Sequence, residues 1–232
     1  MNQVKKLLRG GRVFLENGTW ESCGVLLEEG RIAGLLPEKQ EVPADILQID
    51  CSGKRIAPGL IDTHVHGARG RNYMEGSAEA AAAISDFLIR GGTTSCLATT
   101  TSAGRADEAA ALRGLREASM HPAKGQAEIL GIHLEGPFIN PRNRGSQAEE
   151  NIRAASGPEL EEIAEAAAGA LKIVTLAPEM DGAAEAIDFF IRRGIKVSIG
   201  HTSATFAQAQ AALHAGAGRG THLFNAMPPI HH

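Results

Sequence analysis

From Arg55 onward the chain repeats one pattern, a short apolar segment followed by an Ala-rich segment, and this repetition constrains the fold more than any other feature. The apolar segments are predicted strands at residues 56–63, 93–98, 128–134, 171–176, 195–200 and 219–223. A helix is predicted between each strand and the next. Repeats of strand, helix and strand bury a parallel sheet beneath a layer of helices, so this part of the chain is predicted to be a parallel α/β structure.

Cap residues support the predicted helices. Ser77 precedes the first Ala-rich run and is expected to cap it. Ser156 and Glu159 have the spacing of a capping box that opens the third helix. Asp181 is expected to open the fourth helix and Gly194 to end it.

A parallel α/β chain forms either an open sheet or a barrel. No G-x-G-x-x-G follows the first predicted strand, and residues 63–70 carry two histidines and an arginine instead. This disfavours a dinucleotide-binding sheet. We therefore predict a TIM-type (β/α)8 barrel with its first six strands present, so residues 56–232 are expected to be an incomplete barrel.

Residues 1–55 have a different pattern. Five short β-type segments lie between Val4 and Asp50, separated by turn signals that include Asn17-Gly18 and Glu29-Gly30. Such dipeptides suit tight hairpins. We predict a small antiparallel β module, which the family resemblance described below implies to be the N-terminal part of a small β-sandwich.

Composition excludes several function classes. The net charge is −4, from 23 basic and 27 acidic residues, and the basic residues are scattered, which argues against a nucleic-acid partner. The longest apolar runs fall far short of the ~20 residues of a membrane span, and no membrane partner is expected. The first residues lack the apolar region of a secretory signal, so a cytoplasmic protein is expected.

Five candidate metal ligands follow or end four of the predicted strands. His64 and His66 form an H-x-H whose alternation places both side chains on one face. Alone this is a weak signal, but Glu135, His201 and His222 stand at the ends of the third, fifth and sixth strands. In a barrel these ends meet at one mouth. Imidazole and carboxylate groups are ligands that Zn²⁺ and similar metals accept, so we predict a metal site that activates water for hydrolysis.

Three further polar residues lie near these ends. His133 shares a strand face with Glu135 and is expected to be a hydrogen-bonded core histidine, or alternatively a group beneath the site. Asp62 and Glu179 are expected to be structural polar residues rather than ligands.

Four motifs together resemble the amidohydrolase superfamily, and within it the N-acetylglucosamine-6-phosphate deacetylase family. They are Pro58–Gly67, His133–Phe138, Gly200–Ala204 and Thr221–Pro229, of which the last is the most specific. The resemblance extends over essentially the whole chain, including the β module.

The resemblance implies a set of metal ligands. Glu135, His201 and His222 match the principal ligands, and His64 and His66 match the site of a second metal. The implied cofactor is one or two Zn or Fe ions.

The resemblance also implies how substrate is held. Asn225 and the backbone of Ala226 match positions that bind the sugar phosphate, and Ser146 and Gln147 match a pair that contacts substrate. The catalytic Asp that serves as general acid and base is expected beyond residue 232, so no residue with that role is predicted within the chain.

The implied reaction is metal-dependent hydrolysis of the acetamide of N-acetylglucosamine 6-phosphate, giving glucosamine 6-phosphate and acetate, by an enzyme that is a homodimer at full length. Two alternatives stay open. One is another amidohydrolase that acts on a cyclic amide or an N-acyl amino acid. The other is a catalytically silent metal-binding fragment, because six strands cannot close an eight-stranded barrel.

Overall fold

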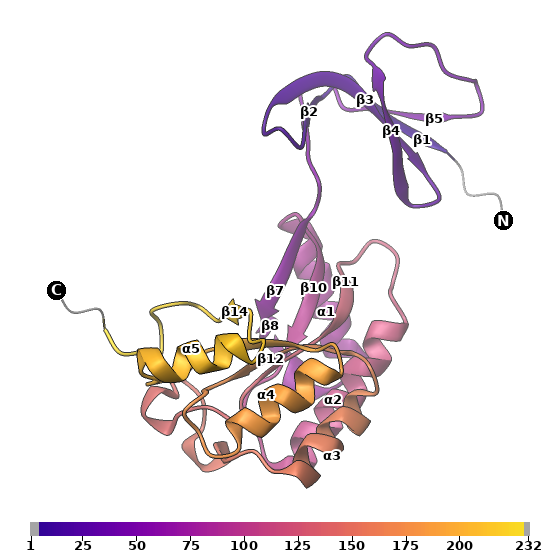
Figure 1. The fold of residues 1–232 in the computed structure, drawn as a ribbon. Coiled ribbons are helices and arrows are strands. Elements are labelled where there is room, and N and C mark those ends of the chain that lie inside the picture. The colour runs from indigo at the N-terminus through magenta and orange to yellow at the C-terminus, as the bar shows by residue number, and fades with distance from the viewer. Residues whose placement is uncertain (1–4, 230–232) are drawn as a thin grey trace. The chain divides into compact units, whose positions relative to one another are not determined.

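A computed structural model describes residues 5–229 (Figure 1). The chain consists of two compact units, Met1–Gly59 and Leu60–His232. Among residues 5–229, no helix has both the length and the apolar content that a membrane span requires.

A parallel six-stranded sheet forms the centre of the second unit. Its strand order is β14-β13-β12-β11-β10-β7, and every neighbouring pair is parallel. The strands are β7 (Leu60–Val65), β10 (Thr93–Thr99), β11 (Glu128–Glu135), β12 (Leu171–Leu176), β13 (Lys196–Ile199) and β14 (Arg219–Gly220). Strands adjacent in the chain are adjacent in the sheet, as in a barrel wall, and the predicted α/β barrel class is confirmed.

The first strand of this sheet begins later than expected. The sequence predicts one strand over residues 56–63, but Arg55–Ile56 forms the separate strand β6 of the first unit, and β7 begins at Leu60. Pro58 lies between the two strands and lacks an N–H for a sheet ladder, which explains the break.

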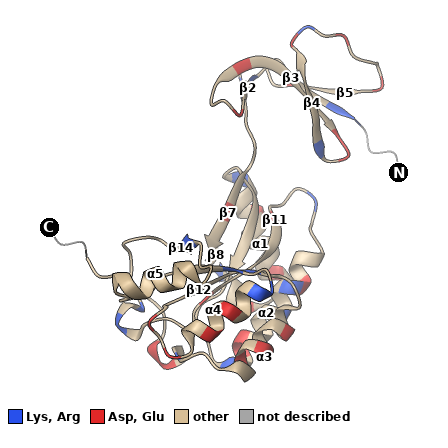
Figure 2. Ribbon diagram, viewed as in Figure 1, with Lys and Arg blue, Asp and Glu red and all other residues tan. Residues whose placement is uncertain are grey.

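Within residues 5–229, five α-helices cover the sheet. They are α1 (Ala78–Arg90), α2 (Arg105–Met120), α3 (Gly157–Ala167), α4 (Ala183–Arg192) and α5 (Phe206–His214). Packing connects α1 with β10 and α2, α2 with β11 and α3, and α3 with α4, which lies on β13. The core between the layers is apolar and includes Ile84, Leu112, Leu115, Ile132, Leu134, Val174, Leu176, Ile187 and Phe190. On the outer surfaces of α2, α3 and α4, charges of both signs are interspersed (Figure 2).

Short elements complete this unit. They are the two-residue strands β8 (Gly67–Ala68) and β9 (Arg71–Asn72) and the 3-10 turns η1 (Tyr73–Glu75), η2 (Pro141–Asn143) and η3 (Glu149–Asn151). The two 3-10 turns η2 and η3 lie in the long connection between β11 and α3, which forms part of the candidate site below.

The helix caps agree only partly with the sequence. Ser77 caps α1 as expected, because its side chain accepts a hydrogen bond from the Ala80 N–H. The N-cap of α4 is Gly182 rather than Asp181. Ser156 stands at the N-cap of α3, but its side chain makes no cap hydrogen bond, and the predicted capping box with Glu159 does not form.

Glu159 is instead held by two arginines. Its carboxylate accepts from Arg153 Nε at 2.5 Å and from Arg105 Nη2 at 2.9 Å. Arg153 also lies 3.5 Å from the carboxylate of Glu108 on α2. Glu159 is buried, and a buried carboxylate requires a paired charge, so its ion pairs with the two arginines outcompete the local cap.

The first unit is a β module. Its six strands are β1 (Lys6–Arg9), β2 (Arg12–Phe14), β3 (Trp20–Glu28), β4 (Arg31–Pro37), β5 (Leu47–Asp50) and β6 (Arg55–Ile56). They form one sheet of order β5-β1-β3-β2-β6, with β4 also paired to β3. Val4, the predicted start of the first strand, lies outside the described residues. That this sheet belongs to a sandwich stays a prediction.

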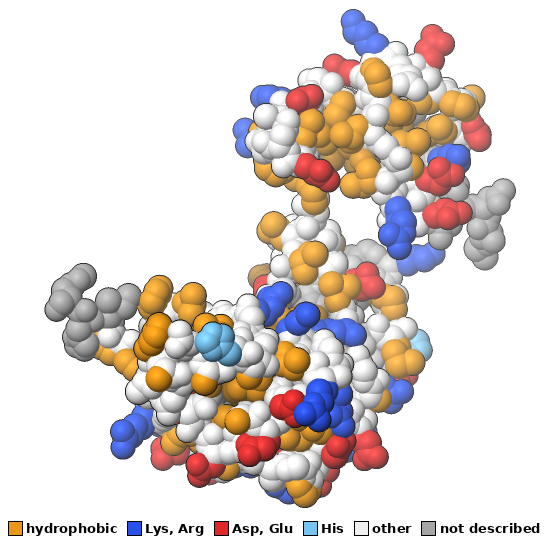
Figure 3. All heavy atoms as spheres, in the orientation of Figure 1, with side chains coloured by type: hydrophobic (Ala, Val, Ile, Leu, Met, Phe, Trp, Pro, Cys, Tyr) orange, Lys and Arg blue, Asp and Glu red, His pale blue; other side chains and the backbone are white. Residues whose placement is uncertain are grey.

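The module is not purely antiparallel, which corrects the expectation from the sequence. Hairpins join β2 to β3 and β3 to β4, the second through Glu29 and Gly30, which both have positive φ. The pairs β1–β5 and β2–β6 are parallel. The nine residues between β4 and β5 are too many for a tight turn and allow the chain to cross before it pairs. Apolar side chains gather on the visible face of this unit (Figure 3).

A side chain at Gly114 is expected to destabilise the fold, because α2 lies very close to the turn that follows η1 at this position. A Cβ at Gly114 would lie 1.9 Å from the Gly76 carbonyl oxygen, so Gly114→Ala should lower the free energy of unfolding by about 1–3 kcal/mol despite the better helix propensity of Ala. Gly157 begins α3 in open space, and Gly157→Ala should be neutral or stabilising by up to about 1 kcal/mol. Urea unfolding of both variants measures the difference. Equal changes in the free energy of unfolding of the two variants would show that the close approach of α2 to Gly76 does not require glycine at position 114.

Glu108 is expected to make stability depend on pH. Burial raises its pKa to about 8, although Arg153 partly opposes the shift. Between its usual pKa of 4.5 and about 8, the unfolded chain loses a proton that the folded protein keeps, so the free energy of unfolding falls as pH rises through this window. Glu108→Gln should flatten that fall, whereas Glu117→Gln at an exposed position of the same helix should not. Unfolding curves from about pH 4.5 to 8.5 provide the test, and indistinguishable slopes in the two variants would refute it.

Candidate metal centre

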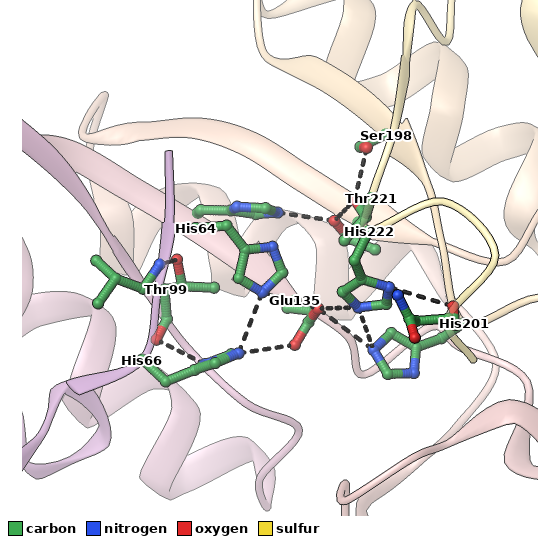
Figure 4. A network of polar contacts seen from close by, with 12 residues as sticks. His64, His66, Thr99, Glu135, Ser198, His201, Thr221 and His222 are labelled. Atoms are coloured by element: carbon green, nitrogen blue, oxygen red, sulfur yellow. Dashed lines mark hydrogen bonds and ion pairs between the residues drawn. The ribbon is translucent and has the colours of Figure 1, made fainter. Parts of the chain in front are cut away.

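The structure brings the five predicted metal ligands together. His64 lies in β7 and His66 directly follows it, Glu135 ends β11, and His201 and His222 each stand two residues beyond β13 and β14. Their ligand atoms form two groups that share Glu135, and within each group all of these atoms lie within 4.8 Å of one another. All four imidazole rings face the Glu135 carboxylate (Figure 4).

Three of the four rings contact one carboxylate oxygen of Glu135, and the fourth ring contacts the other oxygen. Oε1 lies 3.1 Å from His64 Nε2, 3.3 Å from His201 Nε2 and 3.1 Å from His222 Nε2. Oε2 lies 3.1 Å from His66 Nε2. The rings also approach one another in pairs, His64 with His66 and His201 with His222, each pair 3.2 Å apart between Nε2 atoms.

Backbone carbonyls fix the tautomer of three of these rings. The partner of Nδ1 is the carbonyl oxygen of Thr99 for His66 (3.3 Å), of Asn143 for His201 (2.8 Å) and of Asn225 for His222 (3.2 Å). A carbonyl oxygen only accepts hydrogen bonds, so each Nδ1 carries the proton, and a neutral ring then presents a lone pair at Nε2. The three lone pairs therefore face the carboxylate oxygens of Glu135.

This arrangement fits a cation. Lone pairs of nitrogen and carboxylate oxygen repel at 3.1–3.3 Å unless positive charge lies between them, either as a second proton on a ring or as a metal ion. Three nitrogen and oxygen ligands in each group form a donor set that zinc and similar metals accept. Imidazoles that bind metal commonly donate the other N–H to a carbonyl, as these three do. His64, His66, Glu135, His201 and His222 could thus hold one or two ions.

The electrostatics of the centre favour charged forms. Burial alone raises the pKa of Glu135, but hydrogen bonds with His201, His64 and His66 outweigh burial, so the net pKa lies below the usual range. Burial likewise lowers the pKa of His201, and contacts with Glu135 and the Asn143 carbonyl reverse the direction and raise it. The buried carboxylate thus stays ionised and attracts positive charge.

Left-handed backbone conformations place two of the ligands. His201 has a φ of +48° and His222 a φ of +32°, and the nearby Phe224 and Ala226 have φ of +72° and +50°. Such conformations are unfavourable for residues other than glycine and occur where surrounding contacts impose them, commonly at functional sites.

A chain of buried hydrogen bonds lies close to the ligands. His133 Nδ1 contacts the Thr63 carbonyl at 2.8 Å, and its Nε2 contacts Thr175 Oγ1 at 2.7 Å. Thr175 Oγ1 is 2.7 Å from Thr221 Oγ1, which is 2.6 Å from Ser198 Oγ. His133 is therefore a hydrogen-bonded core histidine, as expected, and it lies against the His64 ring.

The direction of these hydrogen bonds is fixed throughout. The Thr63 carbonyl requires the proton of His133 on Nδ1, so Nε2 accepts from Thr175, Thr175 accepts from Thr221, and Thr221 accepts from Ser198. Burial lowers the pKa of His133 to about 4, which agrees with a neutral ring. Thr63 precedes His64 and Thr221 precedes His222, so the chain of hydrogen bonds fixes the relative positions of ligand-bearing segments.

Glu179 ties together the loops around His201. Its carboxylate accepts from Asn140 Nδ2 at 2.9 Å, from Thr202 Oγ1 at 2.5 Å and from the Ser203 N–H at 2.5 Å. Its expected structural role is confirmed. The Asp62 carboxylate accepts from the backbone N–H of His64, also as expected.

The predicted substrate-contacting pair faces two different environments. Ser146 is exposed, whereas Gln147 is buried, with 4% of its surface accessible. The Gln147 amide donates to Glu135 Oε2 at 2.9 Å and accepts from the Ser102 N–H at 2.6 Å.

The predicted phosphate-binding residues lie in the turn that carries His222. The Asn225 carbonyl contacts that histidine, and the Ala226 carbonyl accepts from the Thr202 N–H at 3.1 Å. The Asn225 side chain is exposed and Ala226 is half-buried.

Sequence reasoning missed most groups that hold the ligands. It did not identify the roles of Thr175, Ser198 and Thr221, or the contact of Gln147 with Glu135. Hydroxyl residues near the carboxyl ends of otherwise apolar strands are a usable signal for the first three, because a buried hydroxyl needs a partner. The carbonyls of Thr99 and Asn143 leave no signal in the side chains.

The directed hydrogen-bond chain predicts unequal effects of substitution. Thr175→Val removes both an O–H donor for His133 and an acceptor for Thr221, so it should lower the free energy of unfolding by about 2–4 kcal/mol. Ser198→Ala removes only the terminal donor and should cost about 1 kcal/mol. Denaturant unfolding of the two variants gives the comparison. A loss in Ser198→Ala as large as in Thr175→Val would contradict the assigned direction.

Comparisons with known proteins find relatives of this chain. The N-acetylglucosamine-6-phosphate deacetylase of Bacillus subtilis (strain 168) is 36% identical over 228 residues, which are 97% of this chain and 58% of that protein. The N-acetylgalactosamine-6-phosphate deacetylase of Escherichia coli O157:H7 is 32% identical over 226 residues, with the same coverages. The chain thus spans 58% of the length of these relatives.

A solved structure also matches. It is a mutant of N-acetyl-D-glucosamine-6-phosphate deacetylase from Mycobacterium smegmatis in complex with N-acetyl-D-glucosamine-6-phosphate, with a TM-score of 0.87 and 31% identity over 99% of this chain and 58% of that one. The amidohydrolase family matches residues 55–232, which is most of the sequence. The chain belongs to the amidohydrolase family.

Proposed function

We propose that this chain belongs to a metal-dependent deacetylase that hydrolyses the acetamide of N-acetylglucosamine 6-phosphate to glucosamine 6-phosphate and acetate. The observation that carries the proposal is the convergence of Nε2 lone pairs from three tautomer-fixed imidazoles on one buried carboxylate. The names of the relatives supply the substrate class, and the Mycobacterium smegmatis protein is described in complex with this sugar phosphate.

Two metal positions are proposed. Glu135, His201 and His222 would hold the principal ion, and His64 and His66 would hold a second one together with Glu135. The expected metals are Zn²⁺ or Fe²⁺. A divalent ion at such a site lowers the pKa of the water that it binds and polarises a carbonyl oxygen.

The residues of the chain have distinct tasks in this proposal. Carbonyls on Nδ1 keep the rings of His66, His201 and His222 oriented with Nε2 inward. Asn225 and the backbone of Ala226 are proposed to bind the phosphate, because amide donors avoid the cost of burying a cation. Ser146 is proposed to contact the sugar. The Asp that moves the proton to the departing amine is expected beyond residue 232.

The sugar itself is the least constrained part of the proposal. One relative is an N-acetylgalactosamine-6-phosphate deacetylase at 32% identity, so this epimer is the second candidate substrate. A cytoplasmic location, a homodimer at full length and the absence of nucleic-acid or membrane partners stay predictions.

Metal analysis of purified variants tests the proposed site. Glu135→Ala should reduce bound Zn²⁺ or Fe²⁺ almost to zero, because Glu135 belongs to both groups, whereas His66→Ala should remove at most one ion. Glu128→Ala, at the exposed start of the same strand, should keep the full content. Mass spectrometry of the metals gives the stoichiometry. A Glu135→Ala protein that keeps its full metal would refute the metal centre.

Acetate release by the full-length protein tests the substrate. With metal supplied, it should release acetate from N-acetylglucosamine 6-phosphate faster than from the galactosamine epimer, and a chelator should abolish the release. Cleavage of hydantoins or N-acyl amino acids in place of either sugar phosphate would overturn the deacetylase assignment.

A further inference from the structure

Gln147 makes a direct contact with the metal-facing carboxylate. Its Nε2 lies 2.9 Å from Glu135 Oε2, and its Oε1 lies 2.6 Å from the backbone nitrogen of Ser102. Only this orientation of the amide satisfies both neighbours. The reverse orientation would place oxygen against a carboxylate oxygen and an NH₂ group against an N–H.

The side-chain amide of Gln147 is too deeply buried to contact a ligand directly. Gln147 is 4% exposed, while its neighbour Ser146 is exposed. The backbone also holds it in place, because the Gln147 N–H donates to the Arg144 carbonyl and its own carbonyl accepts from Arg144 Nη1, both at 3.0 Å. The side chain is thus held from both ends and directed at Glu135.

The far end of the amide is anchored in turn. The segment after β10 that contains Ser102 is fixed by Asn151, whose Nδ2 donates to the Ser102 carbonyl at 3.2 Å. Arg153 Nη1 donates to the carbonyls of Ala103 and Asn151, both at 2.7 Å. Arg153 is itself held by Glu159. A rigid support therefore extends from α3 to the Ser102 N–H.

Gly136 allows this support to approach the ligand strand. It directly follows Glu135 with a φ of +77°, and a Cβ there would lie 2.2 Å from Ser102 Oγ and 3.6 Å from Gln147 Oε1. Ser102 can place its hydroxyl this close to the ligand strand because position 136 has no side chain, whereas the contact with Gln147 would be an ordinary one.

From these contacts we infer that Gln147 is a positioning residue, which fixes the rotation of the Glu135 carboxylate so that one oxygen serves His66 and the other serves His64, His201 and His222. The inference rests on the proposed metal-dependent function. It differs from the role that the resemblance implied for Gln147, which was contact with substrate. Hydrogen bonds from outside a metal site orient its ligands, and their loss typically weakens metal binding about 10- to 100-fold.

The two roles predict different measurements. A positioning residue controls metal affinity and leaves the KM for substrate unchanged once metal is saturating. A substrate contact raises KM and leaves metal affinity unchanged.

The experiment compares Zn²⁺ affinity in the wild-type protein, Gln147→Met, Gln147→Ala and the control Gln210→Met. Met matches the length of Gln but offers no amide. Ala leaves a polar space that water can occupy, so the fold should persist even if Met disturbs packing. Gln210 is exposed on α5, and its substitution should change nothing. Competition with a chelating dye gives the Zn²⁺ dissociation constant, and the visible absorption of bound Co²⁺ reports the ligand arrangement.

We expect the Zn²⁺ dissociation constant to rise about 10- to 100-fold in both Gln147 variants, with an altered Co²⁺ spectrum and with circular dichroism like that of the wild type. Unchanged Zn²⁺ affinity in a folded Gln147 variant would overturn the inference and leave the proposed function intact. Equal Zn²⁺ binding by the wild type and Glu135→Ala would instead show that the proposed metal centre itself is wrong.

Discussion

The site at the strand ends depends on one buried carboxylate, that of Glu135, which needs polar partners to be stable in its ionised form. Glu135 is 2% exposed, and an ionised carboxylate in such surroundings is stable only with hydrogen bonds and positive charge around it. Four imidazole nitrogens and one amide supply these contacts, two of the imidazoles from the end of β7 and the other three groups from three further segments of the chain. Almost every other polar feature described around the strand ends holds one of those five groups in place.

The parallel sheet makes the convergence possible, and polar contacts make it specific. Parallel strands bring their carboxyl ends to one edge, but that alone leaves the side chains free to rotate. The carbonyls of Thr99, Asn143 and Asn225 determine which nitrogen of each ring faces inward. The hydroxyl chain from His133 to Ser198 then fixes how the strands sit beside one another, and these contacts offset the cost of the left-handed backbone at the two histidines that follow β13 and β14.

The amino-acid sequence predicted those features that follow from the order of strands and helices along the chain. Strand and helix alternation predicted the parallel sheet, and the positions of His64, His66, Glu135, His201 and His222 at strand ends predicted which residues the fold brings together. It failed where a distant partner competes with a local one. Glu159 forms ion pairs with Arg105 and Arg153 instead of closing a capping box, and Gln147 turns inward although Ser146 beside it faces solvent. Neither the ion pairs of Glu159 nor the inward orientation of Gln147 can be predicted from the residues next to them in the sequence.

The double role of Arg153 has a consequence for how the sequence can vary. Its guanidinium forms an ion pair with Glu159, lies 3.5 Å from the buried carboxyl group of Glu108, and also supports the carbonyls next to the segment that holds Gln147. Two glutamates that touch neither a ligand nor the proposed substrate region are therefore connected to the metal-facing carboxylate. A substitution at Glu108 or Glu159 in the helical layer therefore acts on the support of Gln147 as well as on the packing of the helices.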